Sequence, residues 1–429
     1  MPLTPTLPAD GVPGLSLARR VVTVFAPFGI GYTLSMLFRN INAVAFPELT
    51  REFQLDAGAL GLLTGAYFLS FAAFQVPLGV LLDRHGPRRV DAGLLLIAAA
   101  GAALFAASNS LTLLVVARTL IGLGFCACLM AGLAAVARWF PPERVATLNG
   151  FMMATGALGA LLATQPVEFA IRLVGWRMLF WGLAGATLLT ALVIFVVVPE
   201  KARAAPSRSF GDQVREVLAI VRSKRFWQVA LPAMSVQGFL LALLGLWAGP
   251  WFRDMAGMTQ ADTGRHLLFA AAGWAVGTLC VGLIADGLAR RGIPRLVTFQ
   301  AGCGGCAAAL LVIVFGDPSV GLVAWPVYCA LSAFGTISYT LLTAAWPREM
   351  TARVLTSVNL MMMTTAFVTQ WAVGVVIARW PMVDGRYPPD AYRVAFGTLA
   401  ALVIATVLHA VIGLRGLREL PPGVPDPAR

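Results

Sequence analysis

The chain has 429 residues, of which 59% are hydrophobic and only 12% are charged, and its mean hydropathy is +0.80. Soluble domains carry about 25% charged residues, so this composition excludes a soluble all-helical protein, whose surface it could not cover. The net charge of +12 would suit a nucleic-acid partner, but its distribution along the chain indicates membrane topology instead.

Apolar stretches of about 20 residues, long enough to cross roughly 30 Å of hydrocarbon, recur along the whole chain. We therefore predict an all-α integral membrane protein with twelve transmembrane helices. The predicted spans cover residues 21–46, 58–82, 90–108, 111–138, 145–167, 177–199, 226–252, 263–285, 295–315, 319–345, 354–380 and 392–415.

Lys and Arg are distributed unevenly between the two ends of these spans. With the N-terminus in the cytoplasm, 22 of the 32 lie on the cytoplasmic side, 8 on the other side and 2 within spans. Membrane proteins carry such an excess in their cytoplasmic loops, so both termini are predicted to be cytoplasmic. The first eighteen residues lack a basic segment followed by an apolar core, and no cleavable signal peptide is expected.

The longest polar connection divides the chain into two sets of six spans. Its residues 211–225 have helical spacing of apolar side chains and are expected to lie along the membrane surface. The predicted division is a tail at 1–20, a bundle at 21–199, a linker at 200–225, a second bundle at 226–415 and a tail at 416–429.

A charged turn after the second span recurs, with the same logic, after the eighth span. Each copy has one Asp at the end of an apolar helix, followed by Gly and several Arg. Such a carboxylate can face the positive end of another helix or pair with Arg, and would latch the two halves together; the alternative is a solvated loop charge. The candidate gating residues are Gly79, Asp83, Arg84, Gly86, Arg88, Arg89, Asp286, Arg290 and Arg291.

A second landmark also occurs in both halves. Residues 139–155 and 346–365 each begin with Trp, contain Pro and Arg, and place an Asn (Asn149 or Asn359) before a Met-containing run. Two matching landmarks indicate an internal duplication, which is a recurrent feature of transporters.

The charged turn, the Arg118-Thr-Leu-Ile-Gly-Leu-Gly run of the fourth span and the Gly175-Trp-Arg start of the sixth span together resemble the major facilitator superfamily. The resemblance covers about residues 20–415. It implies two pseudo-symmetric six-helix bundles, alternating access, and a central site built largely from spans one, four, seven and ten.

A narrower resemblance lies in the first two spans, at residues 39–47, 61–67 and 75–79. These are similar to the anion:cation symporter branch, which implies that Arg39 binds the substrate carboxylate. Independently, an Arg within a span is costly and usually functional, and its planar fork suits a carboxylate. The alternatives are snorkelling to the outer surface, or bonds to Asn40, Asn42 or a carbonyl.

The chain departs from that branch where acids are often found. Phe38 stands just before the Arg, and Phe125 and Cys126 follow the Gly-x-Gly of the fourth span. The residues expected for proton symport are therefore missing. Coupling to a proton or to sodium, anion exchange and facilitated diffusion are the alternatives. Arg118, deep in the fourth span, either bonds carbonyls, or contacts an anion or modulates a proton site. The candidate substrate-binding residues are Tyr32, Arg39, Asn42, Arg118, Asn149, Gln237, Trp247, Tyr339 and Asn359.

These observations predict a secondary transporter that takes up a small organic anion and works as a monomer in a bacterial inner membrane. Neither an enzyme activity nor a metal, cofactor or nucleic-acid partner is expected. One alternative is a multidrug exporter, although the fifth span lacks the Gly-Pro-x-x-Gly pattern associated with drug antiporters. The other alternative is a membrane sensor or assembly factor that moves no solute.

Overall fold

A computed structural model describes residues 16–200, 210–346 and 350–415. This part of the chain is helical apart from its connections and one isolated bridge between Val383 and Arg386. Eleven of the described helices are long and apolar enough to cross a membrane, or twelve when the bent pair Pro47–Phe53 and Ala57–Ala73 counts as one span. The predicted all-α membrane fold is confirmed.

The first half contains a π-helical turn and nine α-helices. Its elements are α1 (Leu17–Arg20), η1 (Val21–Phe25), α2 (Ala26–Asn40), α3 (Asn42–Phe53), α4 (Ala57–Ala73), α5 (Gln75–Ala107), α6 (Leu111–Phe125), α7 (Cys128–Trp139), α8 (Pro142–Leu162) and α9 (Gln165–Val197).

The second half begins with the amphipathic helix predicted for the linker. Its elements are α10 (Phe210–Arg222), α11 (Lys224–Ala242), η2 (Leu243–Trp247), α12 (Ala248–Asp254), α13 (Gln260–Arg290), α14 (Arg295–Phe315), α15 (Gly321–Ser332), η3 (Ala333–Thr336), α16 (Ile337–Ala345), α17 (Thr351–Ile377) and α18 (Pro389–Gly413).

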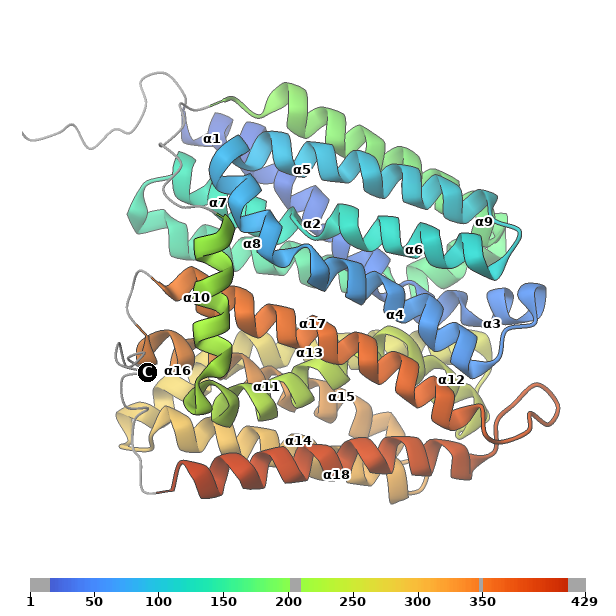
Figure 1. The fold of residues 1–429 in the computed structure, drawn as a ribbon. Coiled ribbons are helices and arrows are strands. Elements are labelled where there is room, and N and C mark those ends of the chain that lie inside the picture. Colours follow the sequence, from blue (N-terminus) through green and yellow to red (C-terminus); the bar gives the residue numbers. More distant parts are fainter. Residues whose placement is uncertain (1–15, 201–209, 347–349, 416–429) are drawn as a thin grey trace, which may run out of the picture.

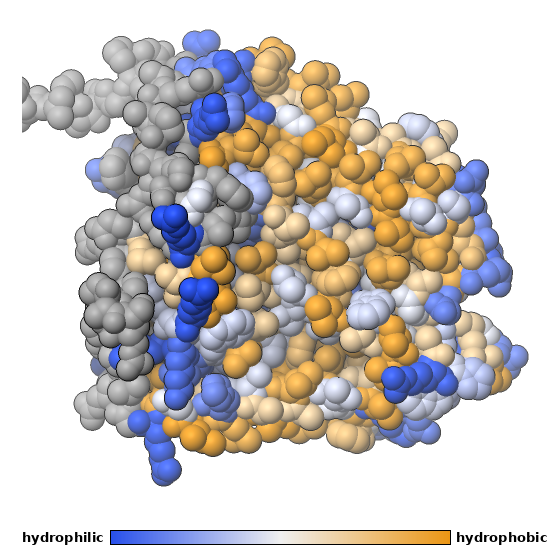
Figure 2. All heavy atoms as spheres, in the orientation of Figure 1, coloured by the Kyte–Doolittle hydropathy of each residue, from blue (hydrophilic) through white to orange (hydrophobic). Residues whose placement is uncertain are grey.

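The two halves lie side by side, each as a bundle of roughly parallel helices, and α10 crosses from one to the other (Figure 1). Apolar side chains form a broad belt around the middle of the visible face, and charged side chains gather at both ends of the helices (Figure 2). This is the surface that a bilayer requires, because lipid covers the belt and water the ends.

Two glycines separate elements that would otherwise form continuous helices. Gly86 lies inside α5 with φ of 77° and divides it into the end of the second span and the whole of the third. Gly175 lies inside α9 with φ of 78° and separates a short outer segment from the sixth span. Residues with a Cβ adopt this conformation rarely, so glycine permits the chain to turn at both places.

The halves approach most closely where α4 of the first half packs along α17 of the second. A Cβ atom added to Gly61 would lie 2.5 Å from the carbonyl oxygen of Gln370, and one added to Gly374 would lie 2.3 Å from that of Ala57. Small residues therefore allow the two backbones to touch, as in other packed membrane helices.

Candidate functional site

The spans expected to line the central site each contain or end at an irregular turn. The first span is interrupted at Ile41 and the fourth at residues 126–127, while the seventh contains η2 and the tenth contains η3. Irregular backbone at membrane depth is tolerated where it lines a cavity or is buried in protein, and it often marks functional positions. The interruptions therefore converge on the region where the sequence placed the substrate.

Arg39 lies at the interruption of the first span and is 7% exposed. Its guanidinium carbon lies 4.9 Å from the centre of the Phe71 ring, and its Nε has no hydrogen-bond partner. Its carbonyl oxygen lies close to Gly245 of η2, so the first and seventh spans meet here. No ion pair among the described side chains involves Arg39. A buried cation without a counterion can accept an anionic ligand.

Two tyrosines from opposite halves lie within electrostatic reach of this guanidinium. Tyr32 is two helical turns before Arg39 on α2, and Tyr339 comes from α16 in the second half. Phenol groups can donate hydrogen bonds to the oxygens of an anion or to sugar hydroxyls. The structure thus brings three of the predicted residues together between the halves.

The remaining polar candidates lie elsewhere around this centre. Asn42 donates from Nδ2 to Thr64 Oγ1 at 3.1 Å, Trp247 donates from Nε1 to the Gln370 carbonyl at 3.2 Å, and Asn359 donates from Nδ2 to Gln75 Oε1 at 3.1 Å. These bonds connect helices, and the last one joins the two halves. By contrast, Gln237 Nε2 and Asn149 Oδ1 are buried without a partner.

Arg118 is completely buried inside the first half rather than between the halves. It donates from NH1 to the carbonyl oxygen of Phe38 at 3.1 Å, and its guanidinium carbon lies 5.5 Å from the centre of the Tyr67 ring and 5.9 Å from that of Phe105. This matches the carbonyl-bonding interpretation of its charge. Its contact is with the backbone just before Arg39, so it supports the interrupted turn.

The charged turns form contacts within their own halves. Arg88 Nε donates to the carbonyl oxygen of Phe195 at 2.8 Å, and Arg89 pairs with Glu200 at 2.8 Å. Asp286 pairs with Arg295 at 2.8 Å on the exposed surface. Arg84 is exposed, and Arg290 and Arg291 border a shallow hollow near α13's end. The side chain of Asp83 lies outside the described residues, so the expected latch stays a prediction.

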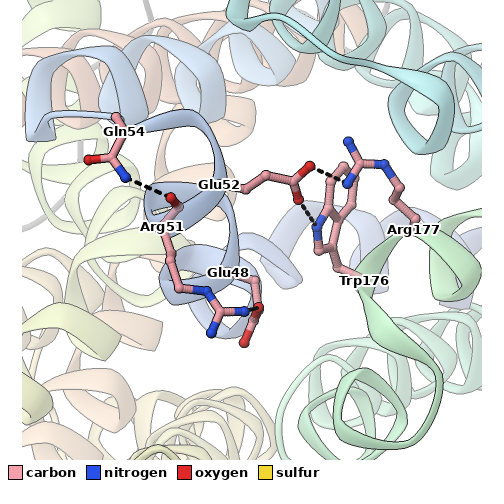
Figure 3. A network of polar contacts seen from close by, with 6 residues as sticks. All are labelled: Glu48, Arg51, Glu52, Gln54, Trp176 and Arg177. Carbon is pink, nitrogen blue, oxygen red and sulfur yellow. Dashed lines mark hydrogen bonds and ion pairs between the residues drawn. The ribbon is translucent and has the colours of Figure 1, made fainter.

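The Gly-Trp-Arg start of the sixth span has a clear role on the opposite side of the molecule. Glu52 of α3 accepts a hydrogen bond from Trp176 Nε1 at 2.9 Å and pairs with Arg177 (Figure 3). Arg177 also donates to the carbonyl oxygen of Ser108 at 2.8 Å. These contacts connect α3 with the outer ends of the third and sixth spans.

Asp91 is a buried acid that the sequence did not indicate. Asp91 is completely buried in α5, and neither carboxylate oxygen has a hydrogen-bond partner of ordinary geometry. It stands second in the predicted span 90–108, so it resembled a charge at the membrane edge. The available signal was its position after the Gly86 break, which places it a full turn inside the third span.

Residues 28–370 match the Major Facilitator Superfamily, and the chain belongs to this family of membrane transporters. Among curated relatives, it is 28% identical over 219 residues to the galacturonate transporter of Dickeya chrysanthemi, a match that covers 47% of this chain and 64% of the relative. It is 26% identical to the hexuronate transporter of Escherichia coli strain K12, over 47% of this chain and 51% of the relative. The matches thus span about half to two thirds of these relatives.

Solved structures share the fold. A bacterial homolog of the human lysosomal transporter Spinster, in an inward-facing and occupied conformation, aligns with a TM-score of 0.70 at 20% identity, covering 93% of this chain and 96% of that one. A D-xylose–proton symporter aligns with a TM-score of 0.68 at 15% identity, covering 89% and 97%. The predicted fold of two six-helix bundles is confirmed.

Proposed function

We propose that the protein takes up a small organic anion, of the sugar-acid class, by alternating access in a bacterial inner membrane, with both termini in the cytoplasm. The single observation that carries this proposal is Arg39: a cation buried between the halves without a counterion among the described side chains. The names of the galacturonate and hexuronate transporters support the substrate class.

The geometry around Arg39 explains how an anion would be held. A carboxylate can bind the planar guanidinium through two parallel hydrogen bonds, while Tyr32 and Tyr339 contact the same ligand from the two halves. A ligand touched by both halves draws them together, and its binding therefore favours the closed state between inward and outward openings.

Thermal stabilisation of the purified protein tests the proposal. Galacturonate and glucuronate are expected to raise the transition temperature, while neutral galactose is not, because ligands stabilise the folded state by mass action. In Arg39→Gln, removing one partner of a desolvated charge pair costs about 2–5 kcal/mol, so affinity should fall about thirtyfold or more.

Arg265→Gln is the matched control, since Arg265 has an exposed side chain and a surface ion pair with Asp262. It should bind sugar acids like the wild type. Stabilisation by lipophilic cations alone, indifferent to Arg39, would contradict the proposal and favour an exporter. Stabilisation by sugar acids without flux in proteoliposomes would favour a non-transporting sensor.

A further inference from the structure

Asp91 lies in surroundings that make an ionised carboxylate costly. Asp91 lies one turn before Leu95 on α5, and a Cβ atom added to Gly31 would lie 3.8 Å from each of Leu95, Cys128 and Ile194. The carboxyl group therefore sits where α2, α5, α7 and α9 converge. An unpaired carboxylate in such an interior binds a proton or needs a compensating charge nearby.

No described cation faces this carboxyl group. On its own helix, Arg88 bonds to the Phe195 carbonyl of α9, and both Arg88 and Arg89 pair with Glu200, which follows α9. From α7 the facing titratable group is the Cys128 thiol, with Cys126 at the end of α6 beyond it. From α2 it is Tyr32, and the stretch 178–197 of α9 contains no ionisable side chain.

These groups connect Asp91 with the proposed anion site. Cys128 lies beside Asp91 and also within electrostatic reach of Tyr32, which is in turn within reach of Arg39. The Cys128 thiol and the Tyr32 phenol thus lie in the interior of the first half between the elements that carry the carboxyl group and the guanidinium. Buried charges interact over longer distances than charges in water, because little water screens them.

We propose that Asp91 is the proton-binding residue of this transporter, and that one proton on its carboxyl group crosses the membrane with each organic anion bound at Arg39. The inference rests on the proposed function. In the loaded form the anion neutralises Arg39 and the proton neutralises Asp91. In the empty form the guanidinium and the ionised carboxylate carry opposite charges that sum to zero, although the two groups are not in contact. In either form the charges of Arg39, Asp91 and the bound anion sum to zero. A form that carries only the anion or only the proton has a net charge at these groups and reorients poorly.

The cargo is one proton and one monovalent anion, so the cycle is electroneutral. A pH difference of about one unit, acidic outside, should therefore drive about tenfold accumulation of galacturonate in proteoliposomes of the wild type. In Asp91→Asn the side chain cannot release a proton, so galacturonate should only equilibrate, while exchange of internal for external galacturonate continues. Asp91→Glu should recover part of the accumulation, and Asp390→Asn, on the exposed surface, should accumulate like the wild type.

Accumulation by Asp91→Asn at the wild-type level would overturn the assignment. A second readout separates it from failure of the proposed function. The infrared absorption of a protonated carboxyl group in a dry environment should rise and fall with pH in the purified wild type and be missing in Asp91→Asn. If galacturonate is not transported at all but this band is present and changes with pH, the proposed substrate class is wrong and the assignment of Asp91 as a proton-binding residue is kept. If the band is absent at every pH, the proton site fails.

Discussion

Two buried arginines in the first half differ in what their charges contact. Arg39 lies against the Phe71 ring of the first half, and Tyr339 of the second half is within electrostatic reach of its charge. Arg118 is enclosed by one bundle and donates to the carbonyl oxygen freed next to the interruption of the first span. The charge of Arg39 is therefore available to a ligand. The charge of Arg118 is instead bonded to the backbone that positions Arg39.

This difference predicts different effects of truncation. Arg118→Ala should lower the free energy of unfolding by about 2–5 kcal/mol, the range of large-to-small substitutions in a packed core, because it leaves a cavity and an unpaired Phe38 carbonyl. Thermal denaturation in detergent measures it, with Arg39→Ala for comparison. An Arg118→Ala variant as stable as the wild type would show that Arg118 has no structural role.

The sequence indicated Arg39 because a cation within a span is rare and the surrounding motif is specific. It could not indicate that Tyr339, three hundred residues later, shares the same centre, because that depends on how the two bundles meet. Asp91 was missed for a related reason: its isolation results from the convergence of four helices, and each of them alone looks apolar and unremarkable in sequence.

At the scale of elements, glycine decides where helices of the two halves touch. Gly61 and Gly65 of α4 face the Gln370 and Phe367 backbone of α17, and Gly374 of α17 faces Ala57. Apolar length alone located these spans correctly, but it carried no information on the turns at residues 41, 126–127, 243–247 and 333–336. Those turns depend on tertiary packing that re-satisfies the freed backbone groups.

Gly61→Val tests whether this contact keeps the outer side shut. The added methyl groups would overlap the Gln370 carbonyl, and overpacking of this kind costs about 1–3 kcal/mol, which the protein relieves by separating α4 from α17. A cysteine placed at Ala57 should then react about tenfold faster with an impermeant maleimide.

Gly304→Val provides the control, because no atom lies within 4 Å of a Cβ added there. It should leave the labelling rate unchanged. Equal acceleration by both variants would mean that general loosening, and not the helix crossing, controls access.

At the scale of the whole molecule, one hydrogen bond closes the outer boundary between the halves. The Ala57 N–H, at the start of α4, donates to the Tyr387 hydroxyl oxygen at 3.0 Å, and Tyr387 lies in the connection between α17 and α18. The Tyr387 N–H in turn donates to Asp254, which also accepts a bond from the Tyr392 hydroxyl at 2.6 Å. Burial raises the pKa of the Tyr387 phenol, so the group stays neutral in this position.

Tyr387→Phe should favour outward opening. The lost bond is worth about 0.5–1.5 kcal/mol, enough to shift a two-state equilibrium by about twofold to about thirteenfold. Distances between spin labels on the outer ends of α4 and α17 should lengthen in a larger share of molecules than in the wild type. An unchanged distance distribution would show that the phenol oxygen plays no part in closure.

Charge is divided unequally between the interior of each half and the boundary that separates them. Among the side chains that the structure describes, the ion pairs all join residues of one half, as Glu52 with Arg177 and Asp286 with Arg295 do. The described bonds across the boundary, from Asn359 to Gln75 and from Ala57 to Tyr387, are neutral. The described ion pairs thus hold elements together within each bundle, whereas the described hydrogen bonds between the bundles join uncharged groups. Rocking along this seam separates none of these described pairs, so screening by dissolved salt is expected to weaken them inside each bundle and not at the contact between the bundles.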